Sequence, residues 1–357
     1  MPIFEELHRN RSENLHFVQH RESGLYGVIA IHDSSLGPAI GGISFRDYPD
    51  ESTLVHDALR LAEHTSLASA TFGCSAGGGR ALIWCAPEQK TDFMVRALGA
   101  FIDSLGGRFI ATLDLGMTPQ DLALVGRETH FVAGIPRNEA EEGLPTRLVA
   151  RGVFLGIKAA AKAALGVSSL EGLKIGIQGL GKIGRAVLEM VAAEKAFPSI
   201  TDLSFERVKI ARDRFRGAEM IPHEAFLREP FDILVPCAWG GILTREVVEN
   251  LRCRVIAGSA SGLLAEDSLA KRLHERNILY IPEFVTNSGD LLLAEADLTH
   301  IYRGSCTARV EAVFYRVESL ISKAAESGRT PWEVAREEAH EQMKQVQSLK
   351  KIYRPRK

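Results

Sequence analysis

The stretch KIGIQGLGKIG, residues 174–184, decides the fold of the second half of this chain. Its beginning, Lys174–Gln178, is typical of a buried strand, and residues 182–193 have the apolar spacing of a helix. The Gly-x-Gly-x-x-Gly spacing between them predicts a tight turn, then close approach of the backbone to a pyrophosphate, then close packing of helix on strand. The start of the helix would offer free N–H groups to the phosphates. The predicted nucleotide contacts in this turn are Gly179, Leu180, Gly181, Lys182, Ile183, Gly184 and Arg185.

An acidic residue follows at the distance that a dinucleotide site requires. Asp202 comes 18 residues after Gly184 (184 to 202), at the end of a short expected strand, 197–202. Its carboxylate would accept hydrogen bonds from a ribose and repel a 2′-phosphate, which favours NAD over NADP as the cofactor. The alternative is a glycine cluster at a helix start with no ligand, and the strand, the helix and the acid together argue against it. Pro198 leaves the placement of Asp202 open, because proline interrupts strand pairing.

Size and composition describe an ordinary soluble protein with room for two domains. The chain has 357 residues, of which 45% are hydrophobic and 25% charged, with a formal net charge of −2. So small a charge gives no long-range attraction for nucleic acid or for an anionic membrane. No apolar run is long enough to span a bilayer. The expected partner is therefore a small-molecule substrate, not a nucleic acid or a membrane.

Cysteine and histidine usage predicts a cytoplasmic protein without a metal. The five cysteines form no CxxC pair and are expected to be reduced and mostly buried. The N-terminal residues 1–6 lack the basic and apolar regions of a secretory signal. The eleven histidines are spread singly, without the spacing of metal ligands.

Strand-like and helix-like segments alternate through both halves, which predicts an α/β protein of two domains with largely parallel sheets. Gly37-Pro38 together with Gly41-Gly42 is expected to break the chain after the first strand, and the polar stretch 134–143 is expected to be a hinge. The last helix begins with a capping box at Thr330. Expected strands are 25–32, 81–84, 109–113, 174–178, 233–236, 255–258 and 279–282; expected helices are 50–68, 94–105, 146–165 and one that starts at Thr118.

Ordered sequence matches reach over nearly the whole length. They comprise residues 31–42, 57–62, 77–79, 113–116, 156–162, 236–241 and 256–260. On these motifs the chain resembles the glutamate/leucine/phenylalanine/valine dehydrogenase family, and most of all its leucine dehydrogenase branch.

The resemblance implies an activity and an architecture. Members of the family catalyse reversible NAD-dependent oxidative deamination of L-amino acids to 2-oxo acids and ammonia. The implied arrangement is a substrate and oligomerisation domain at 1–136, an NAD-binding Rossmann domain at 137–329, and a C-terminal helix, 330–357, that packs back on the first domain. It places the active site between the domains and predicts a homo-oligomer, a dimer or an octamer. It also adds Cys237, Ala238, Ala257, Gly258 and Ser259 to the expected cofactor contacts.

The chain departs from the family pattern at the residues that perform the chemistry. The family's catalytic lysine follows the three glycines, and Arg80 occupies that position here. A guanidinium keeps its proton throughout the useful pH range and cannot serve as the base, although it can polarise a carbonyl or pair with a carboxylate. A second family lysine, which binds the substrate α-carboxylate, is Ala68 here. Its loss would cost on the order of 2–5 kcal/mol of binding.

Other pocket positions are also more apolar than the family pattern. Leu113 replaces an acidic residue of the leucine branch, Gly262 replaces part of an Asp-Asn pair, and the segment 144–149 is apolar at two polar positions. The substrate-binding residues that the resemblance implies are Ile40, Gly41, Gly42, Ala68, Leu113 and Gly262. Asp114, which shuttles protons in family members, is retained. Its carboxylate is expected either to act as a catalytic group or simply to pair with Arg80.

Three hypotheses of function follow. The first is an NAD-dependent oxidoreductase acting on an amine, imine or carbonyl compound that lacks the α-carboxylate. The second is a catalytically inactive homologue with a nucleotide-binding, regulatory or structural role. The third is an ordinary amino-acid dehydrogenase in which Arg80 replaces the lysine, and this one is the least favoured because of the guanidinium pKa. The intact glycine motifs favour the first hypothesis slightly over the second.

Overall fold

The computed structural model describes residues 3–138, 141 and 143–349. It divides into two compact units. Unit 1 comprises residues 1–142, 291–303 and 338–357, and unit 2 comprises residues 143–290 and 304–337. The chain therefore first passes from unit 1 to unit 2 within the stretch 134–143 that the sequence predicts as a hinge. The domain limits expected from the resemblance, 136/137 and 329/330, stay predictions.

Unit 1 is built on a five-stranded sheet with the order β1-β2-β4-β3-β5. The strands are β1 (Asn14–His20), β2 (Leu25–Asp33), β3 (Ala39–Arg46), β4 (Gly77–Trp84) and β5 (Phe109–Leu113). β2 is antiparallel to both β1 and β4, whereas β3 is parallel to both β4 and β5. The expectation of a largely parallel sheet is therefore wrong for unit 1, whose sheet is mixed.

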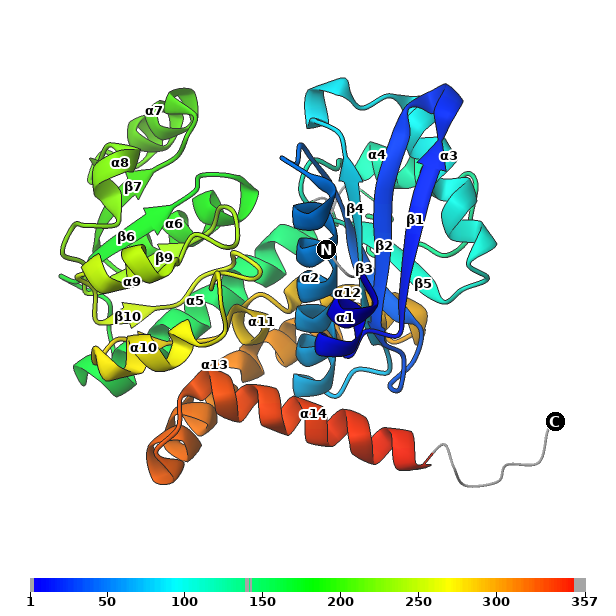
Figure 1. Cartoon of the computed structure of the whole chain (residues 1–357). Coiled ribbons are helices and arrows are strands. Elements are labelled where there is room, and N and C mark those ends of the chain that lie inside the picture. The colour runs from blue at the N-terminus through cyan, green and yellow to red at the C-terminus, as the bar shows by residue number, and fades with distance from the viewer. Residues whose placement is uncertain (1–2, 139–140, 142, 350–357) are drawn as a thin grey trace. The chain divides into compact units, whose positions relative to one another are not determined.

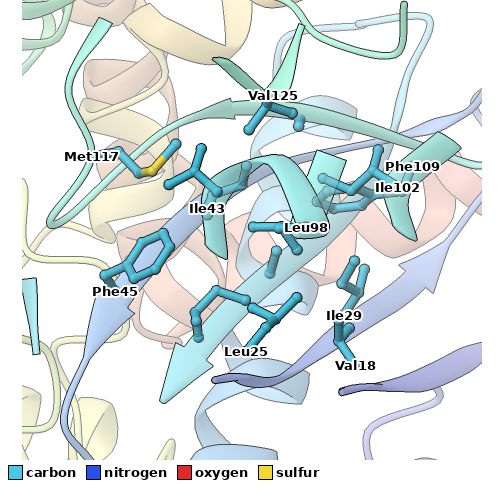
Figure 2. Packing of buried hydrophobic residues seen from close by; sticks show 14 of the residues in the cluster. Val18, Leu25, Ile29, Ile43, Phe45, Leu98, Ile102, Phe109, Met117 and Val125 are labelled. Carbon is cyan, nitrogen blue, oxygen red and sulfur yellow. The ribbon is translucent and has the colours of Figure 1, made fainter. Parts of the chain in front are cut away.

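Helices cover both faces of this sheet. α2 (Glu51–Thr71), capped by the Asp50 carboxylate on the N–H of Thr53, packs its apolar side on Val28 and Leu82. α3 (Asp92–Ser104) and α4 (Pro119–Val125) cover the opposite face, and Figure 2 shows side chains of both helices packed on those of the strands. A short helix, α1 (Ile3–Arg9), precedes β1. The sheet thus holds the ends of β3, β4 and β5 in a fixed register.

Gly41 and Gly42 lie inside a strand and do not form the expected break, whereas Gly37 and Pro38 do lie between β2 and β3. Gly41 belongs to β3, and the run 77–79 forms the start of β4. A Cβ on Gly41 would lie 2.4 Å from the Gly79 carbonyl oxygen and 2.6 Å from the ring of Phe109. Close packing of neighbouring strands and side chains therefore excludes larger residues here, and the glycines continue the strands.

An ion-pair cluster within unit 1 holds three described residues of the hinge stretch, Gly134, Arg137 and Glu141. The Asp297 carboxylate accepts hydrogen bonds from the N–H of Gly134 (2.9 Å), from Arg137 (2.8 Å) and from Nε of Arg303 (2.6 Å). The side chain of Arg303 is only 6% exposed and also pairs with Glu141. The cluster therefore joins Gly134, Arg137 and Glu141 to Asp297 and Arg303, which lie far away in the sequence.

Unit 2 contains a six-stranded sheet in which every pairing is parallel. Its strand order is β11-β10-β9-β6-β7-β8, which in the chain order of this unit reads 6-5-4-1-2-3. This is the strand order of the doubly wound Rossmann fold, as predicted. The strands are β6 (Lys174–Gln178), β7 (Phe197–Thr201), β8 (Glu219–Met220), β9 (Ile233–Pro236), β10 (Val255–Ile256) and β11 (Leu279–Tyr280).

Long helices surround this second sheet (Figure 1). α5 (Leu144–Leu165) packs along α13 (Ser305–Ser327), and a two-pronged ion pair between Arg151 and Glu311 (2.7 and 2.8 Å) joins them. The other helices of unit 2 are α6 (Lys182–Ala193), α7 (Phe205–Arg214), α8 (His223–Phe226), α9 (Arg245–Asn250), α10 (Leu269–Glu275) and α11 (Glu283–Thr286). Most of α12 (Gly289–Leu298) belongs to unit 1, and α14 (Pro331–Leu349) is divided between the units.

The C-terminal helix returns to the first part of the chain, as predicted. The division between the units falls within α14, at residues 337/338, so its second half belongs to unit 1. There His340 lies 3.7 Å from the Glu63 carboxylate of α2. A two-domain α/β fold with a Rossmann-like second unit is thus confirmed. None of the described helices is long and apolar enough to cross a membrane.

Candidate functional site

The candidate catalytic residues of unit 1 come from neighbouring strands of the sheet. Arg80 is in β4, Asp114 directly follows β5, and β3 lies between these two strands. The Arg80 guanidinium forms an ion pair with Oδ2 of Asp114. Arg80 is 9% exposed, whereas the Asp114 side chain is 24% exposed. The two residues singled out from the sequence therefore meet, as the ion-pair reading of Asp114 expected.

Ser44 of β3 is a third member of this site and was missed in the sequence. Its buried hydroxyl donates a 2.7 Å hydrogen bond to the same Oδ2 atom of Asp114. The register explains the contact, because Ile43 pairs with Leu113 and the next residue on each strand is Ser44 and Asp114. Only the strand register could have revealed Ser44, and β3 was not predicted.

Gly42 makes the ion pair possible. A Cβ at this position would lie 2.7 Å from Cβ of Asp114 and 3.1 Å from Nη1 of Arg80. Any larger residue would therefore displace one of the two partners. The predicted substrate contact Gly42 borders the Arg80–Asp114 pair directly.

The surroundings of the pair are small and uncharged at the other predicted positions. Ala68 is a buried residue of α2, and Ile40 and Gly41 are buried in β3. Leu113, the last residue of β5, is half-buried. Because Arg80 and Asp114 neutralise each other, the predicted unit 1 residues together carry no net charge. This neutrality is the main electrostatic property of the candidate site.

In unit 2 the glycine turn has the geometry that phosphate binding needs. Gly179 has a φ of +94°, which glycine adopts without strain. A Cβ on Gly184 would lie 1.8 Å from the Gly179 carbonyl oxygen, so the start of α6 packs on the turn without room for a side chain. At Gly181, the N-cap of α6, a Cβ would meet no atom within 4 Å. The turn thus packs tightly on the start of α6 at Gly184, whereas the space beside Gly181, at the N-terminus of this twelve-residue helix, is free of protein atoms.

Asp202 is well placed in spite of Pro198. β7 forms, and its pairing with β8 involves Ser199 and Ile200, so the missing N–H of the proline interrupts no bond on that side. One oxygen of Asp202 accepts the N–H of Leu180 (2.7 Å), and the other accepts that of Ser204 (2.8 Å). A carboxylate has about four acceptor positions, which leaves two for ribose hydroxyls. The residues therefore fit a nicotinamide dinucleotide.

The remaining predicted cofactor contacts gather at the carboxyl ends of β6, β9 and β10. A Cβ on Gly179 would lie 2.8 Å from the N–H nitrogen of Ala238, and one on Gly258 would lie 2.2 Å from the Pro236 carbonyl oxygen. Burial raises the pKa of the Cys237 thiol to about 11, while a hydrogen bond with Ser259 opposes this shift. The thiol therefore stays protonated. Ala257 is fully buried directly after β10. This edge between β6 and β9 is the switch point at which such folds bind ligands.

The loop after β10 is held by residues that the sequence did not reveal. The buried Glu283 carboxylate accepts the N–H of Gly262 (2.7 Å) and the hydroxyl of Tyr280 (2.6 Å). The side-chain amide of Asn287 donates to the carbonyl of Ser259 (3.1 Å). The predicted substrate contact Gly262 therefore belongs to a rigid loop of unit 2. Its partners come from a segment 21 to 28 residues later, which no local motif could indicate.

The predicted site residues thus form two groups, one in each unit. Unit 1 carries Ile40, Gly41, Gly42, Ala68, Arg80, Leu113 and Asp114, and unit 2 carries Gly262 and all the predicted cofactor contacts. No group of three or more His, Cys, Asp or Glu side chains suited to a metal occurs among the described residues. All five cysteines are free.

Comparison with known proteins identifies the family. Residues 10–131 match "Glu/Leu/Phe/Val dehydrogenase, dimerisation domain", and residues 196–345 match "Glutamate/Leucine/Phenylalanine/Valine dehydrogenase". The chain belongs to the glutamate/leucine/phenylalanine/valine dehydrogenase family. Enzymes of this family depend on NAD or NADP, in agreement with the cofactor predicted from the glycine turn.

The similarity extends over whole chains. A leucine dehydrogenase of Bacillus cereus is 35% identical over 354 residues, which cover 99% of this chain and 96% of that protein. A valine dehydrogenase of Streptomyces virginiae is 35% identical over 334 residues, 93% of each chain. The crystal structure of L-tryptophan dehydrogenase from Nostoc punctiforme is 31% identical and has a TM-score of 0.74, covering 96% of this chain and 99% of its own. The chain is therefore an amino-acid dehydrogenase homologue, similar to enzymes for several different side chains.

Proposed function

We propose that this protein is an NAD-dependent oxidoreductase that acts on an amine, imine or carbonyl compound without an α-carboxylate. The neutral Arg80–Asp114 pair is the observation that carries this proposal. A substrate carboxylate would need a free cation to offset its loss of hydration. Arg80 is already paired, and Ala68 supplies no charge. An uncharged substrate requires neither.

The side chains of the site fit specific roles. When bound, the nicotinamide cofactor supplies or accepts a hydride. Ser44 and Arg80 both bind Oδ2 of Asp114, and Oδ1 has no hydrogen-bond partner among the described residues. Oδ1 can therefore hold the proton that joins or leaves the oxygen or nitrogen of the substrate. Arg80 keeps its own proton and acts electrostatically, by polarising the C=O or C=N bond.

NADH consumption by the purified enzyme, followed at its absorbance maximum, tests this proposal. Uncharged ketones and aldehydes, with and without ammonium, are compared with 4-methyl-2-oxopentanoate plus ammonium. We expect turnover with members of the first set and at least a hundredfold lower kcat/KM with the 2-oxo acid. Brisk conversion of the 2-oxo acid by the wild type would show an ordinary amino-acid dehydrogenase in which Arg80 replaces lysine, as its relatives suggest.

A gain-of-function variant distinguishes a pocket with altered specificity from one that has lost its catalytic function. Ala68→Lys combined with Arg80→Lys restores both lysines of the family pattern, and Arg80→Lys alone is the matched control. We expect deamination of leucine or valine in the double variant only, because both the carboxylate ligand and the base are needed.

A catalytically inactive homologue is the second candidate. Arg80 and Asp114, the two charged residues of the site, form an ion pair with each other, and this pairing opposes a role for either in catalysis. Titration of NADH fluorescence in the wild type distinguishes the two. Saturable NADH binding without turnover of any substrate class would support the inactive homologue. The absence of binding at millimolar NADH would exclude any redox role.

A further inference from the structure

The turn that begins with Asp114 is closed by two bonds of different kinds. The N–H of Met117 donates to the Asp114 carbonyl (3.1 Å), as expected for a tight turn after a strand. The carbonyl of Gly116 instead accepts a 2.5 Å hydrogen bond from Nζ of Lys90, a side chain 26 residues earlier in the chain. The turn therefore depends on one distant side chain as well as on its own backbone.

The same turn packs closely on β3. Gly116 has a φ of +75°, and a Cβ at this position would lie 2.8 Å from the Phe45 carbonyl oxygen. The N–H of Phe45 donates to the carbonyl of Leu115 (2.9 Å). Phe45 directly follows Ser44, whose hydroxyl binds Asp114. Any movement of the turn relative to β3 would therefore also change the contact between Ser44 and Asp114.

Lys90 is held in place by buried partners. Its side chain is only 11% exposed, and Nζ lies 2.5 Å from Oδ2 of Asp121. The same oxygen accepts the N–H (2.7 Å) and the hydroxyl (2.8 Å) of Thr118, which caps α4. Nζ also lies 5.2 Å from the centre of the Phe45 ring, close enough for a cation–π interaction. The ammonium thus connects β3, the turn and the start of α4.

The charges of Lys90 and Asp121 are both retained at neutral pH. Burial opposes ionisation of Asp121, but hydrogen bonds from Lys90 and Thr118 lower the pKa of its carboxyl below the ordinary 3.8. A buried ammonium is stable only where partners replace the water that it has lost. Two of its three N–H groups can be used by Asp121 and the Gly116 carbonyl. The position of Nζ is therefore well defined, and so is that of the carbonyl bound to it.

We propose that Lys90 is a positioning residue for Asp114, which holds the Gly116 carbonyl and so fixes the direction of the Asp114 carboxylate. The proposal rests on the proposed function, in which Oδ1 of Asp114 exchanges a proton with the substrate while Oδ2 is bound by Ser44 and Arg80. A displacement of about 1 Å at a reacting group can lower a rate by about a hundredfold. Without the ammonium, the turn would lose the bond that keeps Oδ1 in place.

Steady-state kinetics of Lys90→Met, with the best substrate of the wild type, test this role. Methionine keeps an unbranched side chain of similar length but has no N–H group. We expect kcat to fall at least tenfold, with KM changed less than threefold and the dissociation constant of NADH unchanged. Lys90→Arg, which keeps a charged donor, should retain most of kcat.

Leu98→Ala is the control for loss of stability alone. Leu98 belongs to α3 and is fully buried in the core cluster that also contains Phe45 and Met117, as Figure 2 shows. The variant should lower the urea midpoint at least as much as Lys90→Met, but its kcat should stay within twofold of the wild type. A loss of kcat in Lys90→Met no larger than in Leu98→Ala would reduce Lys90 to a structural residue and overturn the proposal.

Hydrogen exchange followed by mass spectrometry gives a second test that needs no turnover. Exchange in peptides that cover residues 114–118 should be at least tenfold faster in Lys90→Met than in the wild type, with unchanged exchange in residues 77–84 of β4. It should be unchanged in Lys90→Arg. Unchanged exchange of the turn in Lys90→Met would overturn the positioning role. A wild type that converts no substrate would contradict the proposed function instead, and these exchange rates would then decide whether Lys90 fixes the turn.

Discussion

The glycine turn of unit 2 and the Arg80–Asp114 site of unit 1 differ in what creates their function. The turn depends on backbone geometry, and at Gly184 even one methyl group would collide with the Gly179 carbonyl. The unit 1 site depends on side chains carried by β4, by α2 and by the residue after β5, and lysine, arginine or alanine can occupy such positions on the same backbone. Substitution of the family lysines therefore left the fold intact. A site made of backbone is tied to its fold, whereas one made of side chains can change its chemistry.

The sharpest test of this contrast is Gly184→Ala. Because the added Cβ would lie 1.8 Å from a carbonyl oxygen, we expect a loss of more than about 3 kcal/mol in the free energy of unfolding, and no NADH binding. Urea denaturation and NADH fluorescence measure the two effects. Gly181→Ala is the control: its Cβ meets no protein atom within 4 Å, so it should weaken NADH binding with little change in stability. Native stability in Gly184→Ala would contradict the close packing.

The corresponding change in unit 1 is Asp114→Ala, which leaves the Arg80 guanidinium without its carboxylate. Arg80 is only 9% exposed, but Asp114 is partly solvated, so we expect a loss of about 2–3 kcal/mol. Replacing both residues, Arg80→Leu with Asp114→Ala, should recover part of this loss, because no buried charge then remains unpaired. Urea denaturation of the two single variants and the double variant gives the coupling free energy. Additive losses would show that the pair does not contribute as a unit.

The sequence predicted the glycine turn more fully than the Arg80–Asp114 site, because the turn is formed by residues that are adjacent in sequence. The turn at residues 179–184 is a local motif, so its spacing was sufficient to place the nucleotide contacts. Arg80 and Asp114 were found only through the resemblance to the family. Ser44 was not predicted, because its contact with Asp114 depends on the register between β3 and β5. That register is set by residues far apart in the sequence. The same limit explains Glu283, whose partner Gly262 lies in a different loop.

Two strands of unit 1, β3 and β1, were not predicted because they contain glycine or histidine. Gly41 and Gly42 predict a break in the chain, because glycine usually ends regular structure. Here they are required by close contacts with residues 79, 80, 109 and 114, which are distant in sequence. β1, with two histidines and a glutamine among seven residues, has too weak an apolar pattern to be recognised as a strand. The antiparallel pairing of β2 with β4 also makes the sheet mixed, and strand direction depends on contacts between distant segments that no local pattern indicates.

Acidification should destabilise unit 1 before unit 2, and His32→Asn tests the first half of this expectation. Burial lowers the pKa of His32 below its ordinary value of 6.5, an effect that nearby Glu63 opposes. The folded state therefore binds fewer protons than the unfolded state, and stability is lost as the pH falls below about 6.5. His32→Asn keeps a polar partner for Ser66, which lies 2.9 Å from Nδ1, and should flatten this pH dependence. Hydrogen exchange in β2 and α2 between pH 7 and 5 measures it, and an unchanged slope would contradict the assignment to His32.

The smallest effect is expected for Lys158→Met in unit 2. Lys158 donates a 2.7 Å hydrogen bond to Glu194, which lowers the pKa of that carboxyl below its ordinary 4.5, partly offset by burial. A lowered carboxyl pKa means that the pair stabilises the folded state above about pH 4.5 and loses this contribution as the pH falls further. Both side chains are partly exposed, so the loss at pH 7 should be only about 0.5–1 kcal/mol, and it should vanish towards pH 3. Lys195→Met, which removes an exposed 3.9 Å contact with Glu171, should change neither quantity. An equal loss in both variants would mean that overall charge, and not the Lys158–Glu194 bond, sets the acid response of unit 2.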